Sequence, residues 1–275
     1  VNSVGGFAVP ALLRALGVDD IVEVHCEPTG NFAHNPEPLP ENLGTTANEL
    51  KRVGADIGIV VDPDVDRLAF ITETGDMFGE EYTLVAVADY VLQHRKGCTV
   101  SNLSSTKALK EITEKHGCNY HASAVGEVNV VRTMKAVDAV IGGEGNGGII
   151  VPELHYGRDA LAGIALFLSH LALSGKSCSL LRAQYPTYYI AKNKIELTPD
   201  IDVDMILERL QQKYKNQEVI AIDGVKIHFD ADWVHLRKSN TEPIIRIYAE
   251  SATRSTADAM VRQVQNDIAN FLKND

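Results

Sequence analysis

The chain has 275 residues, 45% of them hydrophobic, which is enough for two or three domains with their own cores. Its formal net charge of −11 argues against a nucleic-acid partner, because phosphate backbones favour an excess of Lys and Arg. No apolar run reaches the roughly 20 residues that span a bilayer, and no signal peptide opens the chain, so we expect no membrane partner. The four cysteines form no CxxC pair, which favours reduced thiols and a cytoplasmic location.

Residues 1–80 predict a metal-binding α/β domain. Hydrophobic periodicity predicts helices over 8–16 and 39–53, a strand over Ile21–His25, and two further strands over Ile57–Val61 and Leu68–Ile71. A βαβ series normally begins with a strand, and none is visible before the first helix. We therefore expect the opening strand of this domain to lie outside the chain.

Residues 81–186 predict a second domain of the same doubly wound kind, and residues 187–275 predict an α+β domain. In the second domain, the expected helices are 83–94, 105–116, 128–135 and 159–173, and the expected strands are 98–102, 122–126 and 139–142. In the third, we expect a strand over 188–197, a helix over 202–214, three strand-like stretches between 219 and 249, and a helix over 256–272. The expected fold is thus two doubly wound α/β domains followed by an α+β domain.

Three aspartates directly follow the strand predicted over Ile57–Val61. Asp62, Asp64 and Asp66 occupy every second position of the loop that starts there. Open α/β sheets bind ligands at the carboxyl ends of their strands, and converging carboxylate oxygens suit a hard divalent cation. The loop therefore predicts a Mg2+ site.

Two other interpretations of this loop are open. With Glu73, the aspartates match the first, third, fifth and twelfth positions of a calcium-binding EF-hand, but Arg67 replaces the required Gly and strands replace the flanking helices. A solvated acidic turn without a metal is the second alternative, because Asp and Pro are ordinary turn residues.

A glycine-rich loop, Gly142–Gly148, follows the last strand predicted in the second domain. Glycines let the backbone approach a ligand closely, and the carboxylate of Glu144 and the amide of Asn146 can bracket vicinal hydroxyls. The loop therefore predicts a sugar site, and a flexible glycine turn is the alternative.

A cluster of hydrogen-bond donors in the third domain predicts a phosphate site. Arg237, Ser239, Asn240 and Thr241 lie within five residues of each other, together with Lys238. Arginine can bind a phosphate through two parallel hydrogen bonds, and such a cluster stands out in an acidic protein. A hairpin turn with solvated charges is the alternative.

Taken in this order, the three motifs resemble those of the α-D-phosphohexomutase family, which comprises phosphomannomutases, phosphoglucomutases and phosphoglucosamine mutases. In that family a DxDxDR loop holds Mg2+, a GE-x-[SN]-G loop contacts sugar hydroxyls, and an R-x-SNTxP loop binds the substrate phosphate. The resemblance covers essentially the whole chain, and residues 32–38 and 155–159 also resemble family segments. It implies that Arg67 adds positive charge beside the metal, and Glu127 and His155 are candidates for general acid and base.

The resemblance implies a mutase that moves phosphate between C1 and C6 of a hexose phosphate through a phosphoserine and a hexose 1,6-bisphosphate. Gly148 stands where many bacterial members have a histidine, which favours a phosphomannomutase or a phosphoglucosamine mutase. The family's phosphoserine motif, of the T-A-S-H-N-P kind, does not occur, because Ala33 precedes His34-Asn35-Pro36.

The chain is therefore expected to hold domains two to four of a four-domain mutase and to be inactive alone. A non-catalytic phosphosugar-binding module is the main alternative function. A phosphatase with Asp62 or Asp64 as nucleophile is another, although it leaves the sugar and phosphate loops without a role.

Overall fold

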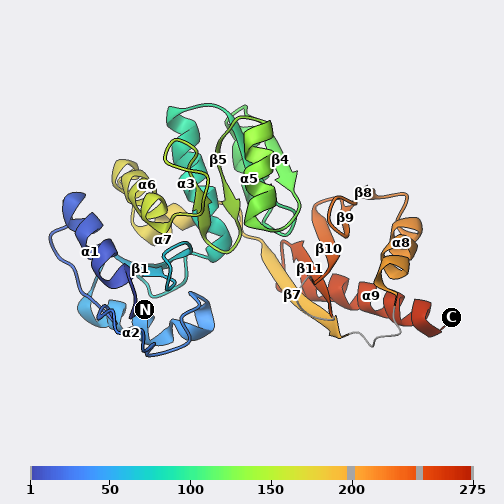
Figure 1. Cartoon of the computed structure of the whole chain (residues 1–275), viewed down its shortest axis with the longest axis horizontal. Coiled ribbons are helices and arrows are strands. Elements are labelled where there is room, and N and C mark those ends of the chain that lie inside the picture. The colour runs from blue at the N-terminus through green and yellow to red at the C-terminus, as the bar shows by residue number, and fades with distance from the viewer. Residues whose placement is uncertain (1, 197–201, 240–243, 274–275) are drawn as a thin grey trace. The chain divides into compact units, whose positions relative to one another are not determined.

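The computed structural model describes residues 2–196, 202–239 and 244–273, which form two compact units that divide after Pro186 (Figure 1). The first unit carries the predicted metal and sugar loops, and the second carries Arg237 and Ser239. Asn240 and Thr241 lie outside the described residues. No helix in the described ranges is both long enough and apolar enough to cross a membrane.

The first unit begins with helices that precede a β-hairpin. The elements are α1 (Gly5–Ala15), the 3-10 turn η1 (Pro40–Asn42), α2 (Gly44–Val53), β1 (Ile57–Val61) and β2 (Leu68–Thr72). The two strands pair antiparallel with Val61 opposite Leu68, so residues 62–67 form the loop that closes the hairpin. The predicted second helix begins as η1 and becomes α-helical only from Gly44.

The strand predicted over Ile21–His25 was wrong, because residues 18–24 and their neighbours form an irregular segment. Val22 is 55% exposed, so this side chain contributes little apolar burial to a strand. His25 has a positive φ of 53°, which ends any extended run, and its carbonyl accepts a hydrogen bond from the Asn2 N–H at 2.7 Å. The alternating sequence alone was therefore not sufficient to form a strand there.

The rest of the first unit is an α/β sheet with helices packed around it. Its elements are α3 (Glu80–His94), β3 (Cys98–Asn102), α4 (Ala108–Lys115), β4 (Tyr120–Ser123), α5 (Glu127–Ala136), β5 (Ala139–Glu144), β6 (Gly148–Ile150), α6 (Ala160–Ser174) and α7 (Cys178–Arg182). The strand order is β4-β3-β5-β6; the first three strands run parallel, and β6 is antiparallel to β5. Because parallel strands end at one edge of the sheet, the last residues of β3, β4 and β5 lie along a common edge.

A cluster of aromatic side chains connects the hairpin to the helices of this sheet. Phe70 of β2 stacks on Phe167 of α6 with ring centroids 3.8 Å apart, and Phe78 meets both rings edge-on. All three side chains are almost fully buried, and burying each contributes about 1.5–3 kcal/mol. Residues 1–186 accordingly form one compact unit, and the division expected at residue 80 stays a prediction.

The second unit is an antiparallel sheet with helices on one face (Figure 1). Its elements are β7 (Tyr189–Glu196), α8 (Val203–Lys213), β8 (Glu218–Ile220), β9 (Val225–Phe229), β10 (Asp232–Lys238), β11 (Ile244–Ser251) and α9 (Arg254–Lys273), and the strand order is β7-β11-β10-β9-β8. Apolar residues of α8 and α9 form the core with alternate residues of the strands. The α+β class is as predicted, but four strands occur where three were expected between residues 219 and 249, because β8 is a separate short strand.

Candidate active site

The hairpin loop between β1 and β2 brings the three predicted metal ligands together. Asp62, Asp64 and Asp66 each offer a carboxylate oxygen that lies within 4.8 Å of the other two. Asp62 is fully buried and Asp64 is exposed, so the group reaches from the protein interior to solvent. Val65 has a positive φ of 60°, which is unusual for a β-branched residue and marks a strained turn between the ligands.

Asp62 fixes the shape of this loop. Its Oδ1 accepts hydrogen bonds from the backbone N–H groups of Asp66 at 3.0 Å and Arg67 at 2.9 Å, and its Oδ2 accepts from Arg67 Nε at 2.6 Å. Burial alone would raise the pKa of Asp62, but these donors outweigh it and hold that pKa below its ordinary value. Asp62 is therefore charged and held in place before any ligand binds.

Arg67 joins the loop to the irregular segment near the start of the chain. Its Nη2 donates to Glu37 Oε1 at 3.0 Å, and its Nη1 also contacts the Glu37 carboxylate. The guanidinium thus pairs with two carboxylates, Asp62 and Glu37, which lie 5 and 30 residues from it in sequence. The structure therefore places this positive charge directly beside the aspartates.

Asp66 provides the observation that tests whether this site fits a cation. Its Oδ1 is buried and has no hydrogen-bond partner in the described part of the chain; the nearest recorded positive group is Arg67 Nε at 3.6 Å. Burial, together with the negative charges of Asp62 and Asp64, raises the pKa of Asp66 to about 6. An unpaired buried oxygen among mutually repelling carboxylates is the environment that a divalent cation stabilises. The donor set therefore fits Mg2+.

The EF-hand alternative is not supported by the position of its twelfth residue. The Glu73 carboxylate accepts a hydrogen bond from the Ser179 N–H at 3.0 Å and also contacts the Ser179 hydroxyl at the start of α7. The group of oxygens that could hold a metal does not include it. Strands β1 and β2, rather than helices, flank the aspartates.

Glu144, the last residue of β5, lies buried at the edge where the parallel strands end. Its Oε1 accepts from Asn102 Nδ2 at 2.8 Å and from the Gly126 N–H at 3.2 Å, and its Oε2 accepts from Arg158 Nη1 at 3.2 Å. Asn146 Oδ1 accepts from the Gly148 N–H at 3.1 Å and so stabilises its own loop. Both predicted sugar-binding residues are thus already hydrogen-bonded to the protein.

The glycine-rich loop packs closely against the hairpin that carries the aspartates. Gly147 has a positive φ of 83°, and a β-carbon there would lie 2.1 Å from the carbonyl oxygen of Leu68, the first residue of β2. The Leu68 N–H donates to the Gly147 carbonyl at 3.2 Å. The glycine is required by this close approach, which the alternative of a flexible turn does not explain.

Arg158 connects these two loops, although no sequence pattern singles it out. Its Nη2 contacts Asp66 of the metal loop, and its Nη1 lies 3.2 Å from Glu144 of the sugar loop. It precedes Asp159, whose side chain caps α6 by accepting from the Ala162 N–H. Only the resemblance of residues 155–159 to a family segment pointed to this arginine.

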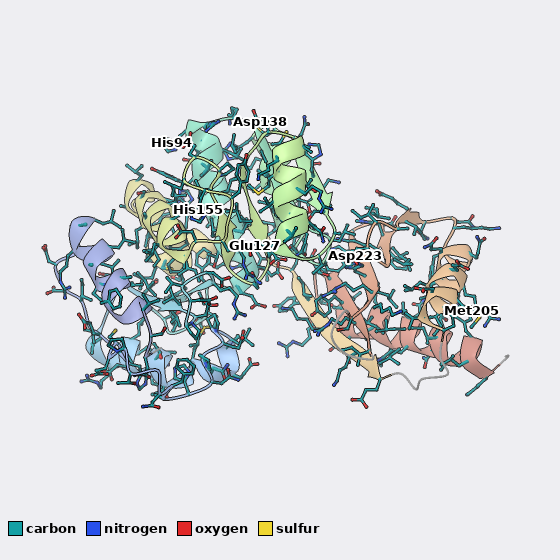
Figure 2. All side chains as sticks on the ribbon, in the orientation of Figure 1. His94, Glu127, Asp138, His155, Met205 and Asp223 are labelled. Atoms are coloured by element: carbon teal, nitrogen blue, oxygen red, sulfur yellow. The ribbon has the colours of Figure 1, made fainter. Side chains whose placement is uncertain are left out.

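The two candidates for general acid and base, Glu127 and His155, both lie near Gly157 in the first unit (Figure 2). Glu127, at the start of α5, accepts from the Arg158 N–H at 3.0 Å, and its other oxygen lies 3.3 Å from Arg158 Nε. His155 is exposed and pairs with Asp159 at 2.9 Å. A β-carbon at Gly157 would lie 3.0 Å from His155 Nδ1 and 3.7 Å from Glu127 Oε1. Their proton-transfer roles stay predictions.

In the second unit, Arg237 lies near the end of β10 with a buried Nε that has no hydrogen-bond partner within the described ranges. Strand register places it opposite Arg246 of β11, which in turn lies opposite Lys194 of β7. Cross-strand neighbours share a face of the sheet, and like charges there destabilise it unless an anion compensates. Ser239 is buried, and its N–H donates to the Ile244 carbonyl at 3.0 Å.

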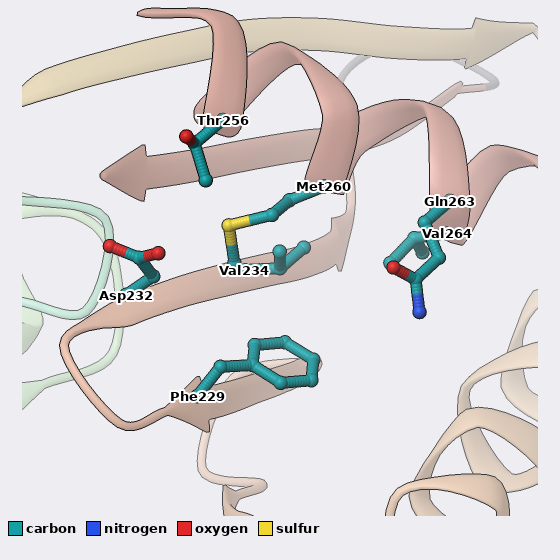
Figure 3. A pocket seen from close by; sticks show the side chains of 7 residues that line it. All are labelled: Phe229, Asp232, Val234, Thr256, Met260, Gln263 and Val264. Carbon is teal, nitrogen blue, oxygen red and sulfur yellow. The ribbon is translucent and has the colours of Figure 1, made fainter. Parts of the chain in front are cut away.

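A separate, mainly apolar pocket lies between α9 and the hairpin of β9 and β10 (Figure 3). It is lined by Phe229, Asp232, Val234, Thr256, Met260, Gln263 and Val264. None of these is a predicted site residue, so the candidate site is built on the loops rather than on this pocket.

The first unit combines a carboxylate cluster that fits a metal with a glycine-rich loop, and in the second unit Arg237 and Arg246 lie opposite each other on neighbouring strands. Three domain models of phosphoglucomutase/phosphomannomutase match: alpha/beta/alpha domain II over residues 1–75, alpha/beta/alpha domain III over residues 79–189, and the C-terminal domain over residues 195–267. The chain belongs to the phosphoglucomutase/phosphomannomutase family. The predicted family resemblance is confirmed.

Relatives of this chain are phosphohexose mutases. It is 36% identical over 258 residues to a phosphoglucomutase/phosphomannomutase of Thermococcus kodakarensis, covering 93% of the chain and 56% of the relative. It is 33% identical over 272 residues to a phosphoglucosamine/phosphogalactosamine mutase of Sulfurisphaera tokodaii, covering 96% and 59%. A crystal structure of a family protein from Burkholderia thailandensis superposes with a TM-score of 0.83 at 25% identity, covering 99% of the chain and 58% of that protein. The chain thus spans less than two thirds of these relatives.

Proposed function

We propose that this chain is the metal-, sugar- and phosphate-binding part of a phosphohexomutase. The complete enzyme is an isomerase that moves phosphate between C1 and C6 of a hexose phosphate through a phosphoserine and a hexose 1,6-bisphosphate. The observation that carries the proposal is the group of three aspartate carboxylates within 4.8 Å, packed beside the Glu144 loop. Asp66 Oδ1 in this group is buried and has no hydrogen-bond partner within the described ranges.

Each part of the metal loop has a distinct task in this proposal. Asp62, Asp64 and Asp66 would hold Mg2+, which supplies positive charge to a phosphoryl group during its transfer. Arg67 orients Asp62 and Glu37, because one guanidinium donates to both carboxylates. The loop is therefore arranged before the metal binds, and little reorganisation is needed at the moment of reaction.

The remaining loops would orient the substrate. Glu144 and Asn146 bind sugar hydroxyls, and Arg237 and Ser239, together with Asn240 and Thr241, hold the phosphate that is not reacting. Binding of the sugar in either of two flipped orientations would present either C1 or C6 for transfer. The expected ligands are thus a hexose phosphate and its 1,6-bisphosphate, with no nucleic acid and no membrane involved.

Glu127 and His155 are proposed as the general acid and base. The Glu127 carboxylate lies 3.3 Å from Arg158 Nε, a contact that holds it in place for a role as base. His155 is exposed beside Asp159, so it can exchange protons with solvent.

The relatives' names span phosphomannomutase, phosphoglucomutase and phosphoglucosamine mutase. We favour phosphomannomutase or phosphoglucosamine mutase for this chain, which we propose to be cytoplasmic. A non-catalytic phosphosugar-binding module is the second candidate, favoured by the absence of a T-A-S-H-N-P motif from the sequence. A coupled mutase assay with Mg2+, a bisphosphate activator and each hexose phosphate separates the two possibilities for the chain itself. We expect no turnover by the chain alone, and turnover would mean that the nucleophile lies within these residues.

Replacing Asp64 by Asn tests the metal site directly. Asp64 is exposed, so the change should affect stability little, but it removes one of three charged ligands. We expect Mg2+ affinity to fall by at least about tenfold in titration calorimetry, since ligand charge sets the affinity of such sites. Asp56→Asn removes an equal, exposed charge just before β1 and is the matched control. Unchanged Mg2+ affinity in the Asp64 variant would defeat the assignment.

A further inference from the structure

Arg158 contacts carboxylates from three separate segments of the first unit. These are Asp66 in the metal loop, Glu127 at the start of α5, and Glu144 at the start of the sugar loop. The Arg158 side chain is only 20% exposed, and its backbone N–H also donates to Glu127. One positive charge is thus shared by three negative charges in a largely desolvated environment, where such pairs are strong.

The contact with Asp66 places Arg158 in competition with a metal ion. Of the two Asp66 oxygens, Oδ1 has no hydrogen-bond partner among the described residues, and Oδ2 is held by Arg158. A divalent cation bound by the aspartates draws on the same carboxylate charge that holds the guanidinium. Metal binding therefore weakens the Arg158–Asp66 pair. The free energy of displacing the guanidinium reduces the net affinity for the metal.

The contact with Glu144 places Arg158 in competition with a sugar in the same way. Glu144 Oε1 is already shared by Asn102 and Gly126, and Oε2 accepts from Arg158. A sugar hydroxyl that donates to Oε2 must replace the guanidinium there. Because Nη1 and Nη2 belong to one planar group, moving it away from Glu144 also moves it away from Asp66.

We propose that Arg158 is a positioning residue that couples the metal site to the sugar site with positive cooperativity. This inference rests on the proposed function. Both ligands displace the same guanidinium, so the first ligand to bind carries the displacement cost and the second does not. Sugar phosphate therefore increases the affinity for Mg2+, and by linkage Mg2+ increases the affinity for sugar phosphate by the same factor.

The test is a titration of Mg2+ into the full chain, with and without saturating mannose 6-phosphate, by calorimetry. In the wild type we expect the sugar phosphate to tighten Mg2+ binding by at least about fivefold, the lower end of typical couplings. In Arg158→Gln we expect tighter Mg2+ binding than wild type without sugar, and no added effect of sugar phosphate. Direct binding of Mg2+ to the sugar phosphate is common to both proteins and cancels in the comparison.

Arg132→Gln is the matched control, because it removes an exposed arginine from α5 without touching these carboxylates. It should keep the wild-type coupling. If Arg158 only stabilised the fold, Arg158→Gln would change the Mg2+ affinity in the opposite direction and bind Mg2+ more weakly than the wild type. If that variant does not fold, Arg158→Lys keeps the charge but lacks the planar fork, and it should show reduced coupling.

The outcomes distinguish this inference from the proposed function. Wild-type protein that binds both ligands with no change in Mg2+ affinity would overturn the coupling and leave the proposed function intact. Coupling that persists in Arg158→Gln would likewise overturn the role of the arginine. Wild-type protein that binds neither Mg2+ nor mannose 6-phosphate would refute the proposed function, and the inference with it.

Discussion

Replacing Gly147 by Ala should destabilise the first unit through two separable effects. The residue has a φ of 83°, a conformation that residues with a β-carbon adopt at a cost of about 1–2 kcal/mol. In addition, the new β-carbon would lie 2.1 Å from the Leu68 carbonyl oxygen, so one backbone segment must move. Overpacking of this kind typically costs about 1–3 kcal/mol, which gives a total of about 2–5 kcal/mol.

Gly117→Ala isolates the first effect. Gly117 has a similar φ of 69°, but no atom lies within 4 Å of a β-carbon built there. It should therefore lose only the conformational cost of about 1–2 kcal/mol. The difference between the two variants, about 1–3 kcal/mol, measures how tightly the sugar loop packs on β2.

The assay is thermal unfolding followed by far-UV circular dichroism. The fluorescence of the single tryptophan is unsuitable, because Trp233 lies in the second unit. For a unit of this size, 1 kcal/mol shifts the melting temperature by about 2–4 °C, so Gly147→Ala should melt several degrees below Gly117→Ala. Equal melting temperatures for the two variants would refute the close packing of Gly147 against Leu68.

Two further predictions concern a buried carboxylate and the phosphate site. Burial would raise the pKa of Asp89, but hydrogen bonds from His170, His116 and Tyr185 outweigh it and hold that pKa well below its ordinary value. The stability that ionised Asp89 contributes is thus present above its unfolded pKa of about 4 and is lost as pH falls toward its folded pKa. In thermal melts between pH 7 and 2.5, Asp89→Asn should be less stable at pH 7 and should lose less stability on acidification than the wild type. The same acid dependence in both proteins would contradict the assigned pairing. Arg237→Gln should weaken mannose 6-phosphate binding by about 10–100-fold in calorimetry, as expected for loss of charge-assisted hydrogen bonds. Arg262→Gln, on the exposed side of α9, is the control and should leave this affinity unchanged. Equal affinities of the two variants for mannose 6-phosphate would place the phosphate site elsewhere.

Much of the fold could be predicted because hydrophobic periodicity and secondary structure agree over most of the chain. The strands Ile57–Val61 and Cys98–Asn102 occur with the predicted bounds, and α6 begins one residue after its predicted start at Asp159, which is its N-cap. One exception, Ile21–His25, has the alternating pattern of a strand but pairs with no strand in the described part of the chain. Periodicity describes one segment, whereas a strand also requires a partner.

The candidate site divides in the same way. Asp62, Asp64 and Asp66 are close in sequence and lie in one hairpin loop, so spacing alone predicted that they converge. Arg158 lies 92 residues from Asp66, and no local pattern connects the two. Glu144 was predicted as a sugar-binding residue in the loop after a strand, and that role stays a prediction. Its donors Asn102 and Gly126, which come from other segments, could not be predicted from local sequence. Contacts of this kind depend on the order of strands in the sheet.

The net charge of −11 and an anionic substrate are compatible because the charges act over different distances. At physiological ionic strength, exposed charges are screened beyond about 8 Å, so carboxylates scattered over the surface contribute little at the phosphate site. Locally the balance is reversed, since the strand register sets Arg237 opposite Arg246 and the Arg237 Nε is buried. Negative charge is concentrated instead in the metal loop, where a divalent cation compensates it. The net charge therefore influences how fast a sugar phosphate approaches, while these local groups determine whether it binds.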